Sequence, residues 1–551
     1  MDRGRAAAAA PYALLGVAVV ASLVTLLSLS SGLTFFQDTW AFLTRRQEFS
    51  AATFFDPHNE HLVAIPVAIE MLLVELFGTT SALPEYLVLN AMLVATALLL
   101  FVYVQRRLGP WPALLATIPV LFLGPAWDVL LWPFEIALVG STMTGLAMLL
   151  ALEREDRRGD LAACLLIALS IGFSSLGIPF AVAAFVDVLQ RRRTLGLRRL
   201  YVPGVALVLF AAWYLGYGHE AKSYLSAENV IHSPTFVAEG VSASVGALSG
   251  LTVLSGDPVG RPYLGFALLV VLVGLYLWKV RRLPGPTSRF WPVVAAGGTF
   301  WVLAAFNRSP GRDAMASRYM HFGAILILLA AADLLKGARF GVRALMVGAA
   351  VVLAATAINF QELEKGSDNL RHQTVLTKAD LGAMEIARKT ISPYFLLSPE
   401  VAGTPSLIDV NATSYFPVAR EHGTPAYTPS ELAAAPEKGR AQADVVLAAA
   451  LPVSLQAHPP RGRARGGCVE LPGGGANRVL RLGPGTTRIE LDPGPRAAVL
   501  LRRFATEGFP IFLGNVQGGS VAELAIPRDR ARRPWRLFLE ARQPARACLP
   551  S

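Results

Sequence analysis

The chain has 551 residues, of which 53% are hydrophobic and only 16% are charged, and its mean hydropathy is +0.47. These values exclude an ordinary soluble protein and indicate an integral membrane protein. The net charge of +11 does not indicate nucleic-acid binding, because the basic residues fall in short clusters between apolar segments.

The first element in chain order is an apolar segment at 11–33, which is long enough to span a membrane. Arg3 and Arg5 precede it and are expected to hold its start in the cytoplasm, so a cleaved signal peptide is a poor fit. The later segments with the same apolar character are 61–78, 85–105, 111–124, 136–152, 161–173, 177–190, 200–217, 263–280, 290–306, 318–335 and 343–360.

The basic clusters decide which of these segments cross. If all of them crossed, the clusters at 106–107 and 191–199 would lie outside, against the positive-inside rule. If the segment 61–78 does not cross the membrane, every basic cluster lies on the inner side. The sequence therefore predicts about eleven crossings, with the amino terminus cytoplasmic and the C-terminal part outside.

The segment 61–78 is amphipathic at helical spacing, with polar Glu60, His61, Glu70 and Glu75 on one half. Its apolar arc holds Leu62, Ile65, Ile69, Leu72, Leu73, Leu76 and Phe77. This pattern predicts a helix that lies in the membrane interface. A spanning helix with its glutamates turned into the bundle is the alternative.

The composition changes after Phe360, and we expect three domains: a membrane domain at 1–360, a mixed α/β connecting region at 361–455 and a β-sandwich or jelly roll at 456–551. The connecting region holds an expected helix at 377–391 and an expected strand at 406–410. Short alternating runs separated by glycine and proline turns predict the β domain. They are 478–482, 488–491, 497–504, 509–516, 521–526 and 535–540.

The chain has three cysteines, and no CxxC or HExxH pattern suggests structural zinc. Cys468 and Cys548 bracket the expected β domain, which the topology places in a compartment where disulfides persist. A bridge between them is therefore expected. Cys164 falls inside a span, where packing is its expected role.

Charged groups near the outer membrane face are the best indicators of chemistry, because desolvating a charge is costly. They concentrate in the first outer loop, 34–60, which contains Asp38, Arg45 and Arg46. The loop ends in the cluster Asp56-Pro57-His58-Asn59-Glu60-His61, which leads directly into the amphipathic segment.

With these features the sequence resembles the GT-C superfamily, the membrane glycosyltransferases that use polyprenyl-phosphate sugars. Members carry an acidic residue in a long first outer loop, then a His-containing motif, then interface helices; Asp38, the motif 58–61 and the segment 61–78 match these in turn. The stretches 127–135 and 317–319 are similar to stretches in uncharacterised bacterial members. The resemblance covers about residues 1–360. Many members have two acidic residues side by side in the first outer loop. This sequence differs from them, because Asp38 is flanked by Gln37 and Thr39.

The resemblance implies an inverting enzyme that moves a sugar from a polyprenyl-phosphate donor to a cell-envelope glycan or glycolipid at the outer face of a bacterial inner membrane. The β domain would hold the carbohydrate acceptor. A sugar phosphate has a good leaving group, so one base suffices. Asp38 is the expected base, and Asp56 or Glu60 takes that role if the loop folds differently. The alternative for Asp38 is a local cap or a pair with Arg45 or Arg46.

The leaving phosphate needs cations at membrane level, and guanidinium groups bind its oxygens bidentately. Arg318 is the expected ligand, with Tyr319 beside it and Arg312, Arg308 and the weaker candidate Arg261 nearby. His58, Glu60 and His61 are expected to contact the acceptor or the phosphate, and Trp127, Trp132 and Glu135 to line an acceptor groove. Ordinary interfacial anchors and an aromatic belt are the alternatives for the arginine and aromatic residues.

No cofactor is certain from the sequence. A divalent cation, Mg²⁺ or Mn²⁺, would need Asp38 to converge with Asp56 or Glu60. No P-loop and no GxGxxG after a strand is present, which disfavours a nucleotide-dependent enzyme. Two other functions stay open: a flippase or transporter for a lipid-linked glycan, and an inactive scaffold that kept the fold without the chemistry.

Overall fold

The computed structural model describes residues 3–46, 48–251, 262–280, 289–398, 407, 410–458, 467–472, 477–491, 493–494, 496–508 and 510–548. The chain divides into two compact units. The bundle unit comprises 1–32, 46–73 and 83–369, and the sandwich unit comprises 33–45, 74–82 and 370–551. The division into domains at 360 and 455 stays a prediction. Arg261 lies outside the described residues.

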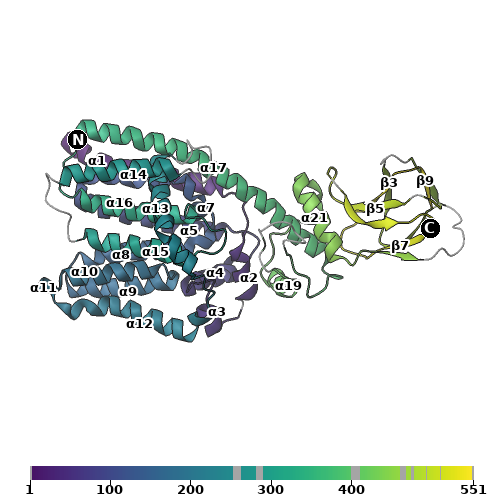
Figure 1. Cartoon of the computed structure of the whole chain (residues 1–551), viewed down its shortest axis with the longest axis horizontal. Coiled ribbons are helices and arrows are strands. Elements are labelled where there is room, and N and C mark those ends of the chain that lie inside the picture. The colour runs from purple at the N-terminus through teal and green to yellow at the C-terminus, as the bar shows by residue number, and fades with distance from the viewer. Residues whose placement is uncertain are drawn as a thin grey trace. The chain divides into compact units, whose positions relative to one another are not determined.

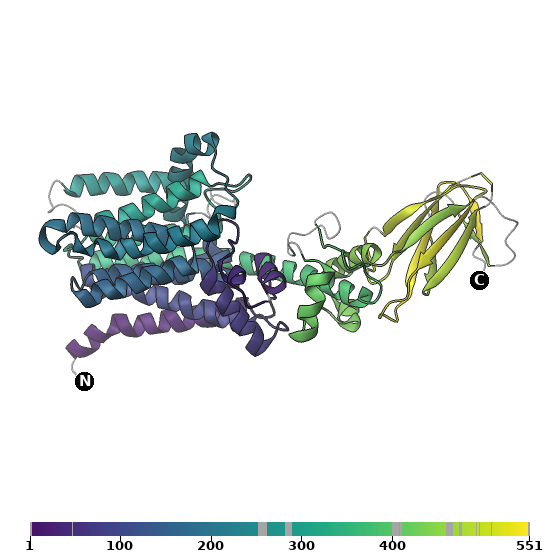
Figure 2. The ribbon, with the colours of Figure 1, turned by 90° about the horizontal axis from the view of Figure 1, so that it is seen from below.

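The bundle unit contains a helix at every predicted span. These helices are α1 (Arg3–Leu29), α5 (Leu83–Leu108), α6 (Pro110–Leu121), α8 (Ile136–Leu152), α9 (Arg157–Phe173), α10 (Gly177–Gln190), α12 (Tyr201–Gly216), α14 (Pro262–Val280), α15 (Phe290–Phe306), α16 (Ser317–Leu334) and the first part of α17 (Val342–Ala387). Figures 1 and 2 show them running side by side.

Among the described residues, six helices are long and apolar enough to cross a membrane, or seven if the bent pair Pro110–Leu121 and Gly124–Leu131 is one span. Three shorter apolar helices accompany them: 177–190, 265–274 and 290–306. Together with the C-terminal β region described below, they confirm the predicted fold class. The protein is a polytopic α-helical membrane protein with a C-terminal β domain. Which end of the bundle faces the cytoplasm stays a prediction.

The segment predicted to lie in the interface forms α4 (Ala64–Phe77), a helix of 14 residues. At 1.5 Å per residue it is about 21 Å long, shorter than the roughly 30 Å hydrocarbon core. It is not among the helices that meet the length requirement for a span. Because α10, at a predicted span, also has 14 residues, the interfacial position of α4 stays a prediction.

The sequence analysis missed α13 (Ala227–Ser249). Its first turn is fixed by Asn229, whose side-chain amide donates to the backbone oxygens of Phe306 (3.2 Å) and Arg308 (3.0 Å) at the end of α15. Its last turn accepts a hydrogen bond of 2.8 Å from Asn359 of α17 to the oxygen of Ala247. Because consecutive spans alternate in direction, both contacts lie at the same end of the bundle. We therefore place α13 across that end, where it adds no crossing.

The opposite end of the bundle is closed by buried ion pairs. Arg107 on α5 donates to Asp333 of α16 at 2.6 Å, and the hydroxyl of Tyr103 donates to the second oxygen of that carboxylate at 2.6 Å. Glu153 accepts from Arg107 at 2.9 Å, and Arg199 pairs with Asp160. Several arginines that the sequence analysis used to orient the chain therefore also join helices to one another.

The sandwich unit begins with helices. Its first segment forms α2 (Asp38–Arg45), and the later part of α17 ends at Ala387. The helix expected at 377–391 is thus the end of α17, and the strand expected at 406–410 lies mostly outside the described residues. Three further helices follow: α19 (Ala412–Glu421), α20 (Pro429–Ala434) and α21 (Glu437–Ala450).

Asp444 anchors α21 to the β region. This carboxylate is only 2% exposed and accepts three backbone N–H groups at the end of one strand: those of Arg503 (2.8 Å), Phe504 (2.8 Å) and Ala505 (3.1 Å). Glu437, at the start of the same helix, accepts the next two amides, those of Thr506 (2.7 Å) and Glu507 (2.6 Å). The turn after that strand is thereby held by two carboxylates of one helix.

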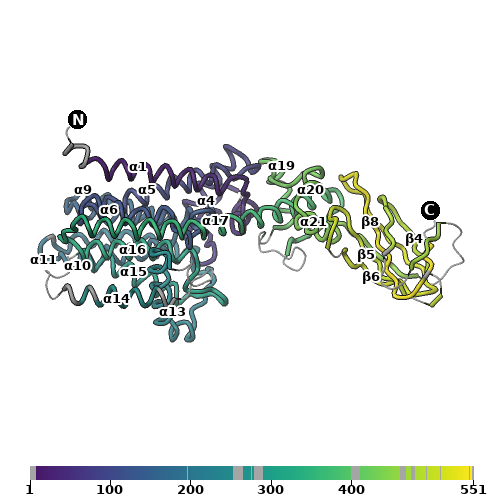
Figure 3. The backbone as a smooth tube through the Cα atoms, turned by 90° about the horizontal axis from the view of Figure 1, so that it is seen from above, coloured from purple at the N-terminus to yellow at the C-terminus, as the bar shows by residue number. Residues whose placement is uncertain are grey.

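The β region is a sandwich of two antiparallel sheets (Figure 3). Five strands form one sheet in the order β1-β7-β4-β9-β2, and four form the other in the order β3-β8-β5-β6. The strands are β1 (Ser454–His458), β2 (Cys468–Leu471), β3 (Asn477–Leu482), β4 (Gly485–Leu491), β5 (Ala497–Arg502), β6 (Ile511–Val516), β7 (Val521–Ile526), β8 (Trp535–Ala541) and β9 (Ala545–Cys548).

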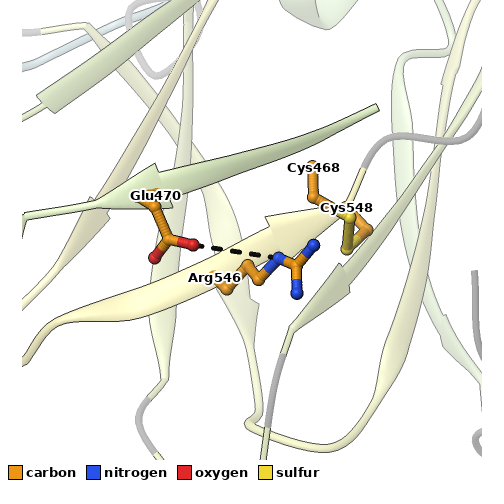
Figure 4. The surroundings of a disulfide bond; sticks show 4 residues. All are labelled: Cys468, Glu470, Arg546 and Cys548. Carbon is orange, nitrogen blue, oxygen red and sulfur yellow. Dashed lines mark ion pairs between the residues drawn. A yellow bond between two sulfur atoms is a disulfide. The ribbon is translucent and has the colours of Figure 1, made fainter. Parts of the chain in front are cut away.

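Alternate residues of these strands form the core between the sheets, as on β8, where Trp535, Leu537 and Leu539 are each at most 1% exposed. A disulfide joins Cys468 on β2 to Cys548 on β9, and the two cysteines are direct cross-strand partners (Figure 4). The next outward-facing pair of the same two strands is Glu470 and Arg546, an exposed ion pair of 3.8 Å.

Candidate functional site

The His-containing motif forms a tight turn in the bundle unit. The backbones of His58 and His61 exchange two hydrogen bonds of 3.0 Å each. Asn59 between them has φ of +53°, in the left-handed region that Asn tolerates better than most residues. Residues directly opposite each other in an antiparallel pair project to the same face. The turn therefore presents both imidazoles on one side.

Arg46 holds the loop that leads into this turn. Its guanidinium donates to the backbone oxygens of Thr53 (2.5 Å), Asp56 (3.0 Å) and Pro57 (3.4 Å). The short helix α3 (Ala51–Phe55) inside the loop is capped by Ser50, which accepts from the amide of Thr53 at 3.2 Å. Arg46 thus has a structural role in shaping the loop.

An aromatic series connects the turn to two other segments. The ring of His58 lies 5.2 Å from that of Phe134, which stacks on Trp132 at 5.1 Å. The guanidinium of Arg318, in the first turn of α16, lies 5.7 Å from the Trp132 ring. Trp132 is 2% exposed, so its position is fixed by packing. Three segments far apart in sequence, 58–61, 127–135 and 308–319, therefore meet at one end of the bundle.

Carboxylates and guanidinium groups alternate within this cluster. The Nε atom of Arg318 lies 3.9 Å from an oxygen of Asp128 and 3.9 Å from an oxygen of Glu135. A nitrogen of Arg312 lies 4.0 Å from an oxygen of Glu60. These separations exceed a direct hydrogen bond, so they are loose ion pairs. A phosphate, which forms shorter bidentate contacts with arginine, competes well in such surroundings.

Two further contacts hold the arginine side of the cluster. Arg312 and Arg318 both lie close enough to Tyr319 to act on its hydroxyl electrostatically. The hydroxyl of Ser317 accepts the backbone amide of Asp128 at 3.2 Å, which joins the start of α16 to α7 (Trp127–Leu131). The aromatic ring of Tyr319 packs between Phe236, Phe300 and Trp301 at centroid distances of 6.2, 5.9 and 6.0 Å.

His61 lies at the cationic side of the cluster. Burial lowers its pKa, and the nearby His58, Arg312 and Arg318 lower it further, whereas Glu60, whose carboxylate is 3.6 Å away, opposes them. A histidine with a lowered pKa stays neutral at neutral pH, so it adds no charge to the cluster.

This shift predicts a pH dependence of stability. Because the folded pKa of His61 lies below its ordinary value of 6.5, the unfolded chain binds the proton first as the pH falls. The contribution of His61 to stability is complete above about pH 6.5 and is lost as the pH falls below it. We expect the thermal midpoint of the solubilised protein to drop less between about pH 7.5 and 5.5 in His61→Asn than in the native protein. Equal drops would contradict the assignment.

The surroundings of the other predicted site residues differ from one to the next. Trp127 packs against Gly366 of α17, where an added Cβ would be 2.4 Å from the indole. The guanidinium of Arg308 lies 5.9 Å from the ring of Phe236 on α13. Asp56 follows α3 and is exposed. Asp38 is the first residue of α2 and belongs to the sandwich unit, where Trp40 packs on Tyr415 of α19.

Asp38 follows an unusual backbone position, because Gln37 has φ of +41°. Non-glycine residues with positive φ are uncommon, and the described chain has three of them: Gln37, Asn59 and Glu155. Two of these three adjoin residues predicted to act in the site. Such local strain is often found where a side chain must be held in a particular direction.

No group of three or more His, Cys, Asp or Glu side chains within the described residues has the arrangement of a metal site. The predicted pairing of Asp38 with Asp56 or Glu60 around a divalent cation stays a prediction.

Sequence reasoning gave little weight to two members of the cluster. Asp128 and Phe134 both belong to the stretch 127–135, and the structure places them on Arg318 and on His58. The stretch 127–135 connects two apolar spans but holds more polar and aromatic residues than a short loop usually does. This composition could have indicated their part in the site.

The fold and this cluster together define a class: a polytopic membrane protein with a charged and aromatic site at one end of its helix bundle. No protein-family model and no curated protein sequence matches the chain.

Solved structures with some similarity include ArnT from Cupriavidus metallidurans bound to undecaprenyl phosphate, at 14% identity and a TM-score of 0.48, covering 76% of this chain and 86% of that one. The apo state of the same protein has a TM-score of 0.46 at 14% identity, covering 76% and 90%.

Proposed function

We propose that the protein is an inverting glycosyltransferase that takes a sugar from a polyprenyl-phosphate donor and transfers it to a cell-envelope glycan or glycolipid. The observation that carries the proposal is the cluster of Arg312, Arg318, Tyr319 and the histidine turn at one end of a membrane-spanning bundle. A lipid-linked substrate presents its phosphate at that depth, with its chain among the helices.

The proposed reaction needs only a phosphate-binding group and one general base. Arg318 and Arg312 hold the phosphate and stabilise the negative charge that grows on it as the sugar departs. No general acid is needed for a phosphate leaving group, and one carboxylate takes the proton of the acceptor hydroxyl. Asp38 is the proposed base, and Glu60, which lies within the cluster itself, is the alternative. Trp132 and Glu135 are proposed to border the acceptor.

The distribution of charge supports an enzyme over a flippase. Transporters place polar groups near the middle of the membrane, commonly on broken helices. Here the loose ion pairs of the site lie at the α16 amino terminus, whereas the tight, buried pairs of Arg107 with Asp333 and of Arg199 with Asp160 join helices at the other end. A site at one end suits a reaction at the membrane surface.

The test is release of free polyprenyl phosphate by the purified protein in lipid, offered a panel of polyprenyl-phosphate sugars and a mixed envelope-glycan acceptor. We expect sugar-dependent release by the native protein. Arg318→Gln should lower kcat/KM by at least about tenfold, through both KM and kcat, because it removes a charged hydrogen bond that binds the phosphate and that strengthens as charge grows on it.

Two variants serve as controls. Arg318→Lys keeps the charge that faces Asp128 and Glu135 but loses the guanidinium fork, so it should fold normally and still bind the donor poorly. Arg308→Gln, in the same loop but beside Phe236, should stay within about threefold of the native protein. No release with any donor, or equal activity of all three variants, would contradict the proposal.

A further inference from the structure

On the outward face of the four-stranded sheet, apolar and charged side chains are arranged in rows across the strands. Along β8, Trp535, Leu537 and Leu539 are buried, whereas Arg536, Phe538 and Glu540 between them are half-buried and point away from the core. Cross-strand partners lie on the same face of a sheet. The register of β3, β8, β5 and β6 therefore tells which side chains line up on the outside.

Two rows follow from that register (strands labelled in Figures 1 and 3). The apolar row runs across all four strands as Val479, Phe538, Leu500 and Phe512. The arginine row runs beside it, across three strands, as Arg481, Arg536 and Arg502. Neighbouring strands are about 4.8 Å apart, so each row is a continuous ridge.

The apolar row is accessible at its two ends. Val479 on the edge strand β3 is 48% exposed, and Phe512 on the opposite edge strand β6 is 57% exposed. The guanidinium of Arg502 lies 5.2 Å from the Phe538 ring, so the two rows touch in the middle of the sheet. A planar apolar surface bordered by guanidinium groups results.

The arginine row has unused hydrogen-bond donors. Within the described part of the chain, Nε and one terminal nitrogen of Arg536, and Nε of Arg502, are buried without a partner. Arg502 is 8% exposed, and its other nitrogens donate to the backbone oxygens of Thr506 (2.8 Å) and Gly508. Because each of these atoms exposes less than 1 Å², an anion from outside the chain meets the row at Arg481, which is exposed, and not at the buried donors.

Two carboxylates of α21 lie near the buried end of the row. Burial, Arg502 and Arg533 lower the pKa of Arg536, against the opposing effects of Asp444 and Glu437. The carboxylate of Asp444 already accepts three backbone amides, and that of Glu437 accepts two. Glu540 is the one acidic residue that the register places on this face among the described strand residues.

We propose that this face of the sandwich binds an anionic glycan, whose sugar rings lie on the apolar row and whose carboxylate or phosphate groups are held by Arg481, with the charges of Arg536 and Arg502 behind it. Aromatic and apolar surfaces with a few charged donors are typical of ligand sites, and guanidinium groups pair bidentately with both anions. The proposal rests on the proposed transferase function in one respect: it names the acceptor as an acidic glycan.

The test measures binding of a fluorescent oligogalacturonate to the full-length protein in detergent, with a dextran oligosaccharide of equal length as the neutral comparison. Arg481→Gln and Phe512→Ser change exposed side chains on the two edge strands and should preserve the fold. Each is expected to weaken oligogalacturonate binding by at least about fivefold, and added salt should weaken native binding. Dextran is expected to bind at least about fivefold more weakly than oligogalacturonate.

Arg478→Gln is the matched control, because Arg478 is on the same strand as Arg481 but pairs with the inward-facing Leu539. It should bind as the native protein does. Native-like binding by Arg481→Gln, equal affinity for dextran, or displacement of the glycan by phosphatidylglycerol vesicles would overturn the proposal, the last in favour of a lipid surface. Glycan binding without sugar transfer would refute the transferase alone, and transfer without glycan binding would refute this site alone.

Discussion

Asp38→Asn is expected to lower turnover of the polyprenyl-phosphate sugar by about 10²–10⁴-fold while leaving donor binding nearly unchanged, because a general base contributes roughly that factor to the chemical step. Asp38 is the first residue of α2, and Asn keeps the size of its side chain there. The substitution removes the negative charge, and donor binding separates loss of the base from loss of the local contacts of Asp38. The measurement is single-turnover release of polyprenyl phosphate, together with equilibrium binding of the donor.

The same assay separates the three carboxylates of the loop that are candidates for the base: Asp38, Asp56 and Glu60. Glu60→Gln is expected to raise KM more than it lowers turnover, because Glu60 lies 4.0 Å from Arg312 and orients a phosphate ligand. Asp56→Asn should change little, since Asp56 is exposed and is held through its backbone by Arg46. If Glu60→Gln abolishes turnover and Asp38→Asn does not, the base is Glu60 and the assignment of Asp38 is wrong.

Asp444→Ala is expected to lower the free energy of opening of the sandwich by about 3–5 kcal/mol, because it leaves three buried backbone N–H groups without an acceptor. Hydrogen exchange of the amides of β5 and β8 in the full-length protein measures this opening directly.

Glu437→Gln is the control for that experiment. Glu437 accepts two backbone amides of the same turn, but its side chain is 29% exposed, so water replaces the lost contacts and we expect a change below about 1 kcal/mol. If both substitutions lower the free energy of opening equally, the loss comes from the contacts of the turn and not from the burial of Asp444.

The spans were predictable because each is an apolar run bounded by charge, glycine or proline. The break between α5 and α6 shows the principle: Gly109 takes φ of +87° and Pro110 starts the next helix. α13 was missed because Glu228, His232 and Glu239 interrupt its sequence and its packing face is built of small residues. At Gly240 an added Cβ would lie 2.1 Å from the ring of Trp301, a contact that no local pattern predicts.

The sequence predicted single residues of the site, but not which of them contact one another. Two histidines three residues apart indicate a local cluster, and an arginine at the start of a span indicates an interfacial cation. That Phe134 would lie between His58 and Trp132, and that Asp128 and Glu135 would both face Arg318, depends on how α5, α8 and α16 pack. Hydrophobic periodicity fixes which face of a helix is buried but not which neighbour buries it.

The strands β1, β2 and β9 were not among the predicted strands. The position of β9 at the end of the sandwich determines when β2 can pair during synthesis. In the described sheet, β2 pairs with β9 alone, although the linked cysteines are 80 residues apart. At roughly 5–20 residues per second, β2 waits about 4–16 s for its partner to be made. During that interval Cys468 has no disulfide partner and β2 has no partner strand, so an oxidant or a chaperone has seconds, not milliseconds, in which to act on the nascent chain.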